Sequence, residues 1–313
     1  MRAVLLITLA LTTGALAQSL HLKDGRVLPT KQLRREKDNI IATMEIPAKE
    51  PGGKPTTGDF GFPLKDIFKL DFPKPSVLDT APELIADGKA EEALGKLEPV
   101  IKYYGGFRDA PGSWWTDLVP LQVEALLALK RDKEAGEVAD TFSRLATDPE
   151  VQKFTKVFTA VARTRKGEHE SALPLYDEAV RSTERTDILG LVAVNKGDSL
   201  TAIAEALAAK GEVEHAAVRF EEALVSYLRI PALYRMQRMY LPQATYGAAR
   251  AYLGMQDFER ARRAVKELTE SFPSTPEAKA APELSQRIEK RAALLAPPEP
   301  GKSKQEKPDE EKK

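Results

Sequence analysis

The sequence predicts a mainly α-helical protein, an irregular solenoid of about five helix pairs preceded by a small all-β part. The first observation is a pattern that recurs about five times, in which a turn residue is followed at helical spacing by small and large apolar residues. In two clear copies, Gly167 and Gly211 are each followed by an alanine after five residues and an aromatic residue after nine. Repeats with a period of roughly 20–50 residues are typical of stacked solenoids. The second observation is that short apolar runs bounded by turn residues precede the repeats, which is typical of strands.

The composition limits the classes of function. Lys plus Arg and Asp plus Glu both number 47, so the formal net charge is zero, and the chain has no cysteine. A chain without excess positive charge is a poor candidate for nucleic-acid binding. The lack of cysteine excludes disulfides, thiolate metal sites and cysteine nucleophiles. We therefore expect no nucleic-acid partner and a fold that is stable through its core alone.

Residues 1–17 read as a secretory signal peptide. Arg2 precedes a short apolar run, and Ala15-Leu16-Ala17 forms a small-x-small cleavage site. We predict a cut between Ala17 and Gln18 and a periplasmic or secreted protein, the periplasm fitting the lack of cysteine. The alternative is a membrane anchor, but the apolar run is well short of the ~20 residues that span a bilayer. No later segment is apolar enough to span either, so no integral membrane segment is expected after cleavage.

Residues 18–75 are predicted to form the small β part. Asp24 and Gly25 suit a hairpin turn, because both can adopt positive φ. A second apolar run covers residues 39–46, and strand-like apolar residues recur over residues 60–72. At this length the pattern favours a compact barrel of four or five strands.

This segment resembles the small SH3-like barrels found at the front of some exported bacterial repeat proteins. The resemblance rests on the Leu-Lys-Asp-Gly-Arg opening at residues 22–26 and on the close between Pro63 and Pro73. Pro73-Lys74-Pro75 is a stiff break, since proline fixes its own φ and biases the preceding residue away from helix. We place the boundary to the helical region there.

Helical periodicity covers residues 76–296. The predicted helices occupy residues 79–88, 91–104, 113–130, 133–145, 149–166, 168–180, 186–210, 212–228, 242–254, 258–272 and 276–295. Pro99, Pro120 and Pro174 lie inside or near these patterns. Because a proline inside a helix costs about 3 kcal/mol and kinks it, we expect some of these boundaries to move. Residues 297–313 are rich in Pro, Lys and Glu without large apolar residues, which predicts a disordered tail.

The alanines of the repeats lie where paired helices would approach closely. They are Ala93, Ala135, Ala172, Ala216 and Ala261, spaced by 42, 37, 44 and 45 residues. In the last copy Tyr252 lies nine residues before the alanine and Pro273 twelve after it. About two thirds of the chain thus resembles a tetratricopeptide repeat array, although that family has a period of about 34 residues. The longer period predicts an irregular superhelix, and the resemblance implies protein–protein interaction on a concave surface.

No catalytic motif is present. The chain has only three histidines, at positions 21, 169 and 215, in separate predicted elements. It contains no Gly-rich phosphate loop, Gly-x-Ser-x-Gly or His-Glu-x-x-His motif. We therefore predict no enzyme activity, no catalytic residues, no cofactor and no metal site.

Two aromatic groups are candidates for partner binding. The first lies in a Gly- and Pro-containing loop with Tyr103, Tyr104 and Phe107 and ends in the adjacent Trp114 and Trp115. Trp and Tyr are frequent in binding hot spots because they bury a large area and keep a polar group. The alternative is that these rings pack on neighbouring helices.

The second group, which we prefer, surrounds the connection at residues 230–242. Its candidate binding residues are Tyr227, Tyr234, Arg235, Arg238 and Tyr240, with Arg229 and Tyr246 beside them. Arg pairs with carboxylates and Tyr offers stacking and hydroxyl contacts, so an acidic peptide or a C-terminal carboxylate would suit this group. The alternative is capping and packing between helices. Met236 and Met239 are predicted to form the buried side of a short helix.

Together these observations predict a scaffold of the bacterial cell envelope that binds segments of a partner protein. One alternative is a structural subunit that associates with itself through its exposed aromatic loops. The other is an enzyme or small-ligand receptor built on a repeat scaffold, for which the motifs offer nothing.

Overall fold

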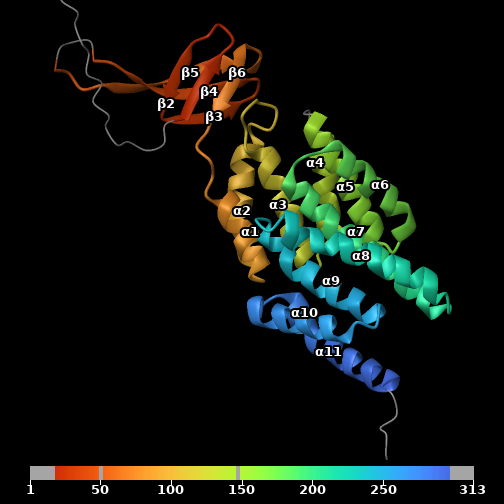
Figure 1. Cartoon of the computed structure of the whole chain (residues 1–313). Coiled ribbons are helices and arrows are strands. Elements are labelled where there is room, and N and C mark those ends of the chain that lie inside the picture. The colour runs from red at the N-terminus through yellow and green to blue at the C-terminus, as the bar shows by residue number, and fades with distance from the viewer. Residues whose placement is uncertain (1–17, 49–51, 146–148, 297–313) are drawn as a thin grey trace, which may run out of the picture.

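The computed structural model describes residues 18–48, 52–145 and 149–296. The predicted signal peptide at residues 1–17 and the predicted tail at residues 297–313 lie outside these residues. The described chain is mainly α-helical, and an all-β part lies at its N-terminal end (Figure 1). The predicted fold class is therefore confirmed at this level.

The β part consists of two three-stranded antiparallel sheets, ordered β2-β1-β6 and β3-β4-β5. The strands are β1 (Gln18–Leu22), β2 (Val27–Thr30), β3 (Gln32–Glu36), β4 (Asn39–Ile46), β5 (Thr56–Pro63) and β6 (Ile67–Asp71), with a 3-10 turn η1 (Leu64–Asp66) before β6. β1 and β2 form the predicted hairpin, with Gly25 at a φ of +90° and Leu20 opposite Leu28. β3 was not predicted, because Leu33 is its one buried residue among polar and charged side chains.

Eleven α-helices follow in the described residues. They are α1 (Val77–Ala86), α2 (Ala90–Gly105), α3 (Trp115–Ala128), α4 (Asp132–Leu145), α5 (Pro149–Arg165), α6 (His169–Ser182), α7 (Thr186–Ala209), α8 (Val213–Leu233), α9 (Leu241–Gly254), α10 (Phe258–Ser271) and α11 (Pro276–Leu295), with a 3-10 turn η2 (Arg238–Tyr240) before α9. Each corresponds to a predicted helix, although α8 ends later than predicted. Within the described residues no helix has the length and apolarity that crossing a membrane requires.

Several helix boundaries differ from the predicted ones, as expected, but the internal prolines are not the cause. Pro99, Pro120 and Pro174 lie inside α2, α3 and α6, and α8 continues through Pro231. A proline removes one backbone donor, but the helix that contains it also buries an apolar face. Pro120 is itself buried in the core. Burial of these faces therefore outweighs the local cost of the lost hydrogen bond.

The repeat pattern corresponds to a repeated local geometry. Each even-numbered helix from α2 to α10 has its repeat alanine as the fourth residue, and all five alanines are buried. The turn before each of these helices contains one residue with positive φ, and these residues are Gly88, Lys130, Gly167, Gly211 and Gln256. A left-handed residue ends one helix and reverses the chain into the next. The five predicted copies are thus five helix–turn–helix pairs.

The odd-numbered helices form one face of the array, which we call the inner face. Successive odd helices contact one another in the pairs α1–α3, α5–α7, α7–α9 and α9–α11. The array also curls, so that α10 and α11 lie beneath the ends of α1 and α2 (Figure 1). A Cβ added to Gly88, in the first turn, would lie 2.5 Å from the carbonyl oxygen of Ser274, in the last loop. The two ends of the array therefore meet.

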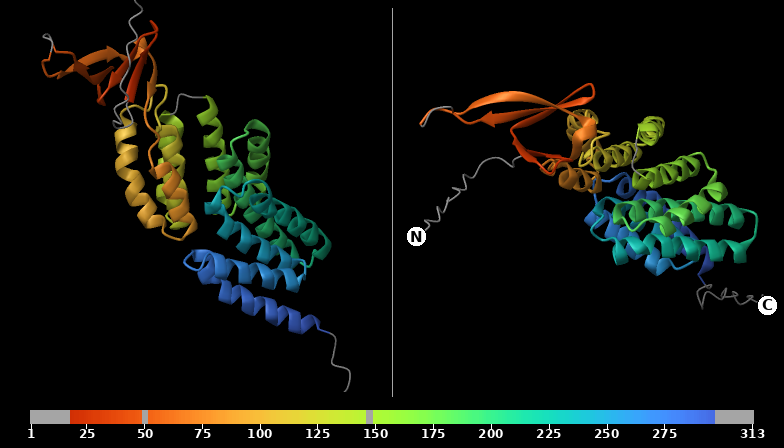
Figure 2. Two further views of the ribbon diagram at one scale, coloured as in Figure 1. Left: turned by 60° about the vertical axis from the view of Figure 1, so that its left-hand side comes forward. Right: turned by 90° about the horizontal axis from the view of Figure 1, so that it is seen from above.

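The β part packs on the first helix pair and the loop after it (Figure 2). Phe72 follows β6, and its ring centroid lies 5.1 Å from that of Tyr104 and 5.2 Å from that of Phe107. The Leu70 N–H donates to the carbonyl of Pro111 at 2.8 Å. Buried residues of the strands and the first helices accordingly belong to one hydrophobic core.

Candidate binding site on the inner face

The first aromatic group joins the β part to the helices. The Trp114 indole N–H donates to the carbonyl of Phe72 at 3.3 Å, and the Tyr103 hydroxyl donates to the carbonyl of Leu33 at 3.2 Å. Trp115 is buried, with its ring 5.1 Å from that of Phe142. Of the two interpretations of this loop, the structure therefore favours packing, and these rings hold the fold together.

The second aromatic group is split between the core and the surface. Tyr227 is fully buried in α8, and its hydroxyl donates to Asp198 at 2.7 Å. Tyr240 is also buried, Tyr234 is half-buried and Arg235 is exposed. The prediction of a buried Met236 was wrong: it is 84 % exposed because α8 ends at Leu233 and the connection turns it outward, whereas Met239 is buried.

The connection that carries this group crosses the inner face. Arg238 forms an ion pair with Glu83 of α1, and the Gln237 amide donates to the Thr186 hydroxyl of α7 at 3.2 Å. The Tyr240 hydroxyl donates to Glu124 of α3 at 3.2 Å. Residues 234–240 thus connect three helices that are far apart in the sequence.

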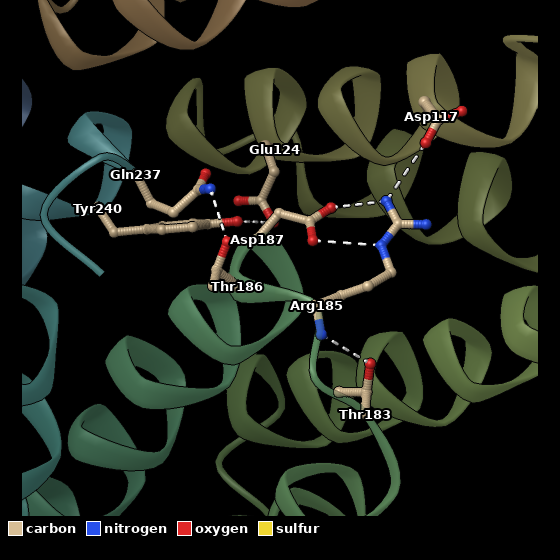
Figure 3. A network of polar contacts seen from close by, with 8 residues as sticks. All are labelled: Asp117, Glu124, Thr183, Arg185, Thr186, Asp187, Gln237 and Tyr240. Carbon is tan, nitrogen blue, oxygen red and sulfur yellow. Dashed lines mark hydrogen bonds and ion pairs between the residues drawn. The ribbon is translucent and has the colours of Figure 1, made fainter. Parts of the chain in front are cut away.

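A network of polar contacts that includes several charged residues lies beside this connection (Figure 3). The Arg185 guanidinium lies 2.8 Å from Asp187 and 3.4 Å from Asp117, so one cation bridges α3 and the start of α7. Burial raises the pKa of Asp117, against the lowering effect of Arg185. Burial also raises the pKa of Glu124 to about 8, although the hydrogen bond from Tyr240 opposes the shift. Glu124 is therefore largely protonated at neutral pH.

Next to this network the inner face contains a cavity of about 340 Å³. This volume is at the lower end of the range for small-molecule sites, ~300–1,000 Å³. Its polar lining comes from α3, α5, α7, α9, α11 and the turn before α4, and consists of Glu124, Lys130, Arg165, Asn195, Asp198, Gln243, Tyr246, Arg250 and Glu277. Its apolar lining includes Ile85, Leu127 and Met239.

Helix geometry explains why these side chains converge. Asn195 and Asp198 are three residues apart on α7 and therefore share a face. Glu277 is held at the start of α11, where the buried Thr275 hydroxyl accepts the Ala278 N–H at 3.2 Å and Pro276 is the first helical residue. Thr followed by Pro is a strong helix start. Burial raises the pKa of Glu277.

Asn195 is the most unusual group in the cavity wall. It is 2 % exposed, and its amide N–H donates to the Leu191 carbonyl at 2.9 Å. Within the described part of the chain its Oδ1 has no hydrogen-bond partner. A buried acceptor without a donor costs about 1–3 kcal/mol, so its retention calls for an explanation.

Sequence motifs did not point to Glu124, Asn195, Asp198 or Glu277. A usable signal was present, since Glu124 lies within the apolar stretch at residues 118–129 and Asn195 directly follows the one at residues 188–194. Nothing in the sequence, however, placed them around one cavity.

The described residues contain no group of three or more His, Asp or Glu side chains placed to hold a metal ion. The three histidines lie on β1, α6 and α8. No protein-family model matches the chain, and no curated protein sequence matches it significantly.

Proposed function

We propose that this protein is a non-enzymatic scaffold of the bacterial cell envelope, with a tetratricopeptide-like array that binds a partner protein on its inner face. The family-like features that support this are the repeat alanines and the left-handed turns, which recur in five pairs. Repeat arrays of this kind use their curved surface for binding. The signal-like residues 1–17 support a periplasmic or secreted location, and the opening of the β part supports the SH3-like resemblance.

The observation that carries the proposal is the inner-face cavity. It is lined by all six odd-numbered helices, α1 and α11 at the two ends of the array included, and within the described residues the Asn195 amide oxygen in its wall has no hydrogen-bond partner. Exposed parts of the connection, Arg235 among them, flank this face. A partner segment that inserts a side chain here would contact helices from most of the array.

A cavity-filling variant tests the proposal. Ala280 of α11 lines the cavity and is half-buried, whereas Gln286 on the same helix is exposed and does not line it. We expect a specific protein from an extract of the source organism to be retained by the wild type and by Gln286→Trp. Retention should fall at least tenfold with Ala280→Trp, because the indole occupies the space for the partner.

Circular dichroism and thermal unfolding of both variants would establish that each remains folded. Equal retention by all three proteins would reject the inner face as the binding surface. Loss with both tryptophan variants would indicate a binding surface elsewhere on α11.

Self-association is the second candidate function, and α8 carries the observation that favours it. Val218, Val225 and Leu228 are exposed large apolar residues on this helix. Contiguous apolar surface is typical of interfaces between proteins. Light scattering would detect a stable oligomer that does not change with concentration, and Val225→Lys would dissociate it. A monomer at all concentrations would exclude this function.

A further inference from the structure

The wall of the inner-face cavity contains a buried acceptor that no donor of the described chain reaches. Asn195 Oδ1 has no hydrogen-bond partner in the described residues, and the buried Glu124 carboxyl accepts a hydrogen bond from the Tyr240 hydroxyl. Asp198 is already bonded by the Tyr227 hydroxyl and the Gln243 amide, each at 2.7 Å. Buried acceptors are normally satisfied, by protein, by water or by a ligand. A bound group that donates hydrogen bonds would therefore satisfy the free acceptor in the cavity wall.

The cations at the cavity are directed to other carboxylates. Arg250 Nη2 lies 2.7 Å from Glu205, and Arg165 Nε lies 3.8 Å from Asp132. Lys130 is exposed in the turn before α4. Neither the buried Glu124 nor the half-buried Glu277 forms an ion pair in the described residues, and desolvation raises the pKa of both. A cation bound in the cavity near these carboxyls would oppose that effect.

The remaining wall suits an alkyl chain that ends in a cation. Ile85, Leu127 and Met239 are buried apolar residues beside the polar groups. Long basic side chains pack their methylene stems on apolar surface and place the charge at a polar site. Tyr246 adds a half-buried aromatic ring to the same wall, and an aromatic face attracts a cation.

We propose that the cavity binds the side chain of a lysine or arginine carried by the partner segment, with Asn195 Oδ1 accepting its N–H and the carboxyls of Glu124 and Glu277 balancing its charge. The inference rests on the proposed function and names the chemistry that the inner face recognises. It differs from the acidic partner that Arg235 and Arg238 suggested. Arg165 and Arg250 at the cavity are already paired with Asp132 and Glu205, and the unsatisfied atom of the wall, Asn195 Oδ1, is an acceptor.

The test is an NMR titration of the full chain with blocked tripeptides. The probe is acetyl-Ala-Lys-Ala-amide, and the matched control is acetyl-Ala-norleucine-Ala-amide, which has an alkyl side chain and lacks the charge. The readout is the Asn195 side-chain amide signal, assigned by its loss in Asn195→Leu. We expect the lysine peptide to shift this signal and to bind about tenfold more tightly than the norleucine peptide, as charged hydrogen bonds imply.

Two carboxyl variants on α11 provide the structural control. Glu277→Gln should weaken binding of the lysine peptide about tenfold. Glu283→Gln, an exposed position outside the cavity on the same helix, should leave binding unchanged. Asn195→Leu should abolish the preference for lysine over norleucine while keeping or raising thermal stability, because it removes a buried acceptor that has no partner.

The pH dependence gives a second readout. Glu124 faces Tyr240 of η2, Arg165 of α5 and Asp187 of α7, and burial raises its pKa to about 8. A bound cation stabilises the carboxylate, so binding near pH 7 should release a proton and affinity should rise up to about tenfold per pH unit until Glu124 is ionised. Glu124→Gln should abolish the proton release and the rise of affinity with pH. If Glu124 had only a structural role, both would persist in this variant.

The outcomes separate the inference from the proposed function. Equal binding of the two tripeptides would overturn the basic side chain as occupant, even if Ala280→Trp still abolished capture of the partner. Tighter binding of n-butylamine than of the lysine peptide would assign the cavity to a free amine and overturn a partner-borne side chain. Partner capture insensitive to Ala280→Trp, with selective lysine binding retained, would reject the proposed function alone.

Discussion

Glu124 shows at the scale of one residue how burial changes a side chain's chemistry. It lies in α3 among apolar neighbours, and its buried carboxyl accepts a hydrogen bond from Tyr240. Burial raises its pKa from 4.5 to about 8. The folded protein therefore holds a proton at neutral pH that the unfolded chain has released.

We expect Glu124 to make folding stability depend on pH. Because its folded pKa is the higher one, its stabilising contribution is complete below about pH 4.5 and is lost as the pH rises through about 8. Urea unfolding at pH 5, 6, 7 and 8 would measure this. Relative to the wild type, Glu124→Gln should gain about 1 kcal/mol or more over that range, since each pKa unit corresponds to ~1.4 kcal/mol. Parallel pH profiles would contradict the assignment.

The turn residues give a second prediction at this scale. Gln256 has a φ of +63° in the turn before α10, a conformation that costs a residue with a Cβ about 1–2 kcal/mol. Gln256→Gly should therefore raise the free energy of unfolding by about 0.5–1 kcal/mol, after the entropy of the more flexible unfolded chain is subtracted. The matched control is Gly211→Ala, where an added Cβ meets nothing within 4 Å and φ is +84°, so it should destabilise by a similar amount. Chemical denaturation would show both.

At the scale of the elements, close contacts between rings and glycines set the spacing of the helices. A Cβ added to Gly197 of α7 or Gly247 of α9 would lie 2.6 Å or 2.2 Å from the Tyr227 ring of α8. These helices can approach because neither glycine has a side chain. Tyr227 thus belongs to the packing of the array, which explains why its hydroxyl reaches Asp198 at the cavity.

The junction between the β part and the helices gives the third prediction. Gly112 has a φ of +90°, and an added Cβ would lie 1.9 Å from the carbonyl oxygen of Leu70 in β6. Gly112→Ala should destabilise the protein by at least about 2 kcal/mol, because strain and a backbone clash add. Gly95→Ala in α2, where an added Cβ has free space, should instead stabilise by about 0.5–1 kcal/mol. Thermal unfolding of the two variants would measure this difference. Equal changes in stability would contradict the close contact between Gly112 and Leu70.

At the scale of the whole molecule, the connection at residues 234–240 links the middle of the array to its first helix. The ion pair between Arg238 and Glu83 joins residues 155 positions apart, and both side chains are about half exposed. Exposed ion pairs contribute about 0–1 kcal/mol. The buried contact between Tyr240 and Glu124 is therefore the stronger restraint on this connection.

The fourth prediction concerns this connection. Replacing Arg235 and Arg238 by Ala together should lower the free energy of unfolding by less than about 1 kcal/mol. If these residues contact the partner, its retention should fall in the same variant. Tyr227→Ala is the reference for damage to the core and should cost about 3–5 kcal/mol. A loss from the double arginine variant comparable to that of Tyr227→Ala would show that the arginines are structural.

The sequence alone was sufficient for the fold class and, within the described residues, for the eleven helices and the five turns between paired helices. These features depend on local interactions, since helical periodicity and a left-handed turn residue involve only residues a few positions apart. A repeat array forms the same local contacts in each copy. The effect of the prolines was mispredicted because their local cost is offset by burial of the helix's apolar face. The sequence does not show how much of that face is buried.

Only the tertiary structure brought Glu124, Asn195 and Glu277 to one cavity. Their convergence depends on the curvature of the array. That curvature results from many contacts between helices, including the close packing of the Tyr227 ring on Gly247. Tertiary packing also decided that Trp114 bonds to Phe72 after the last strand and that Trp115 packs on Phe142 of α4. Helical spacing predicts which residues share a face, but it does not predict which faces meet.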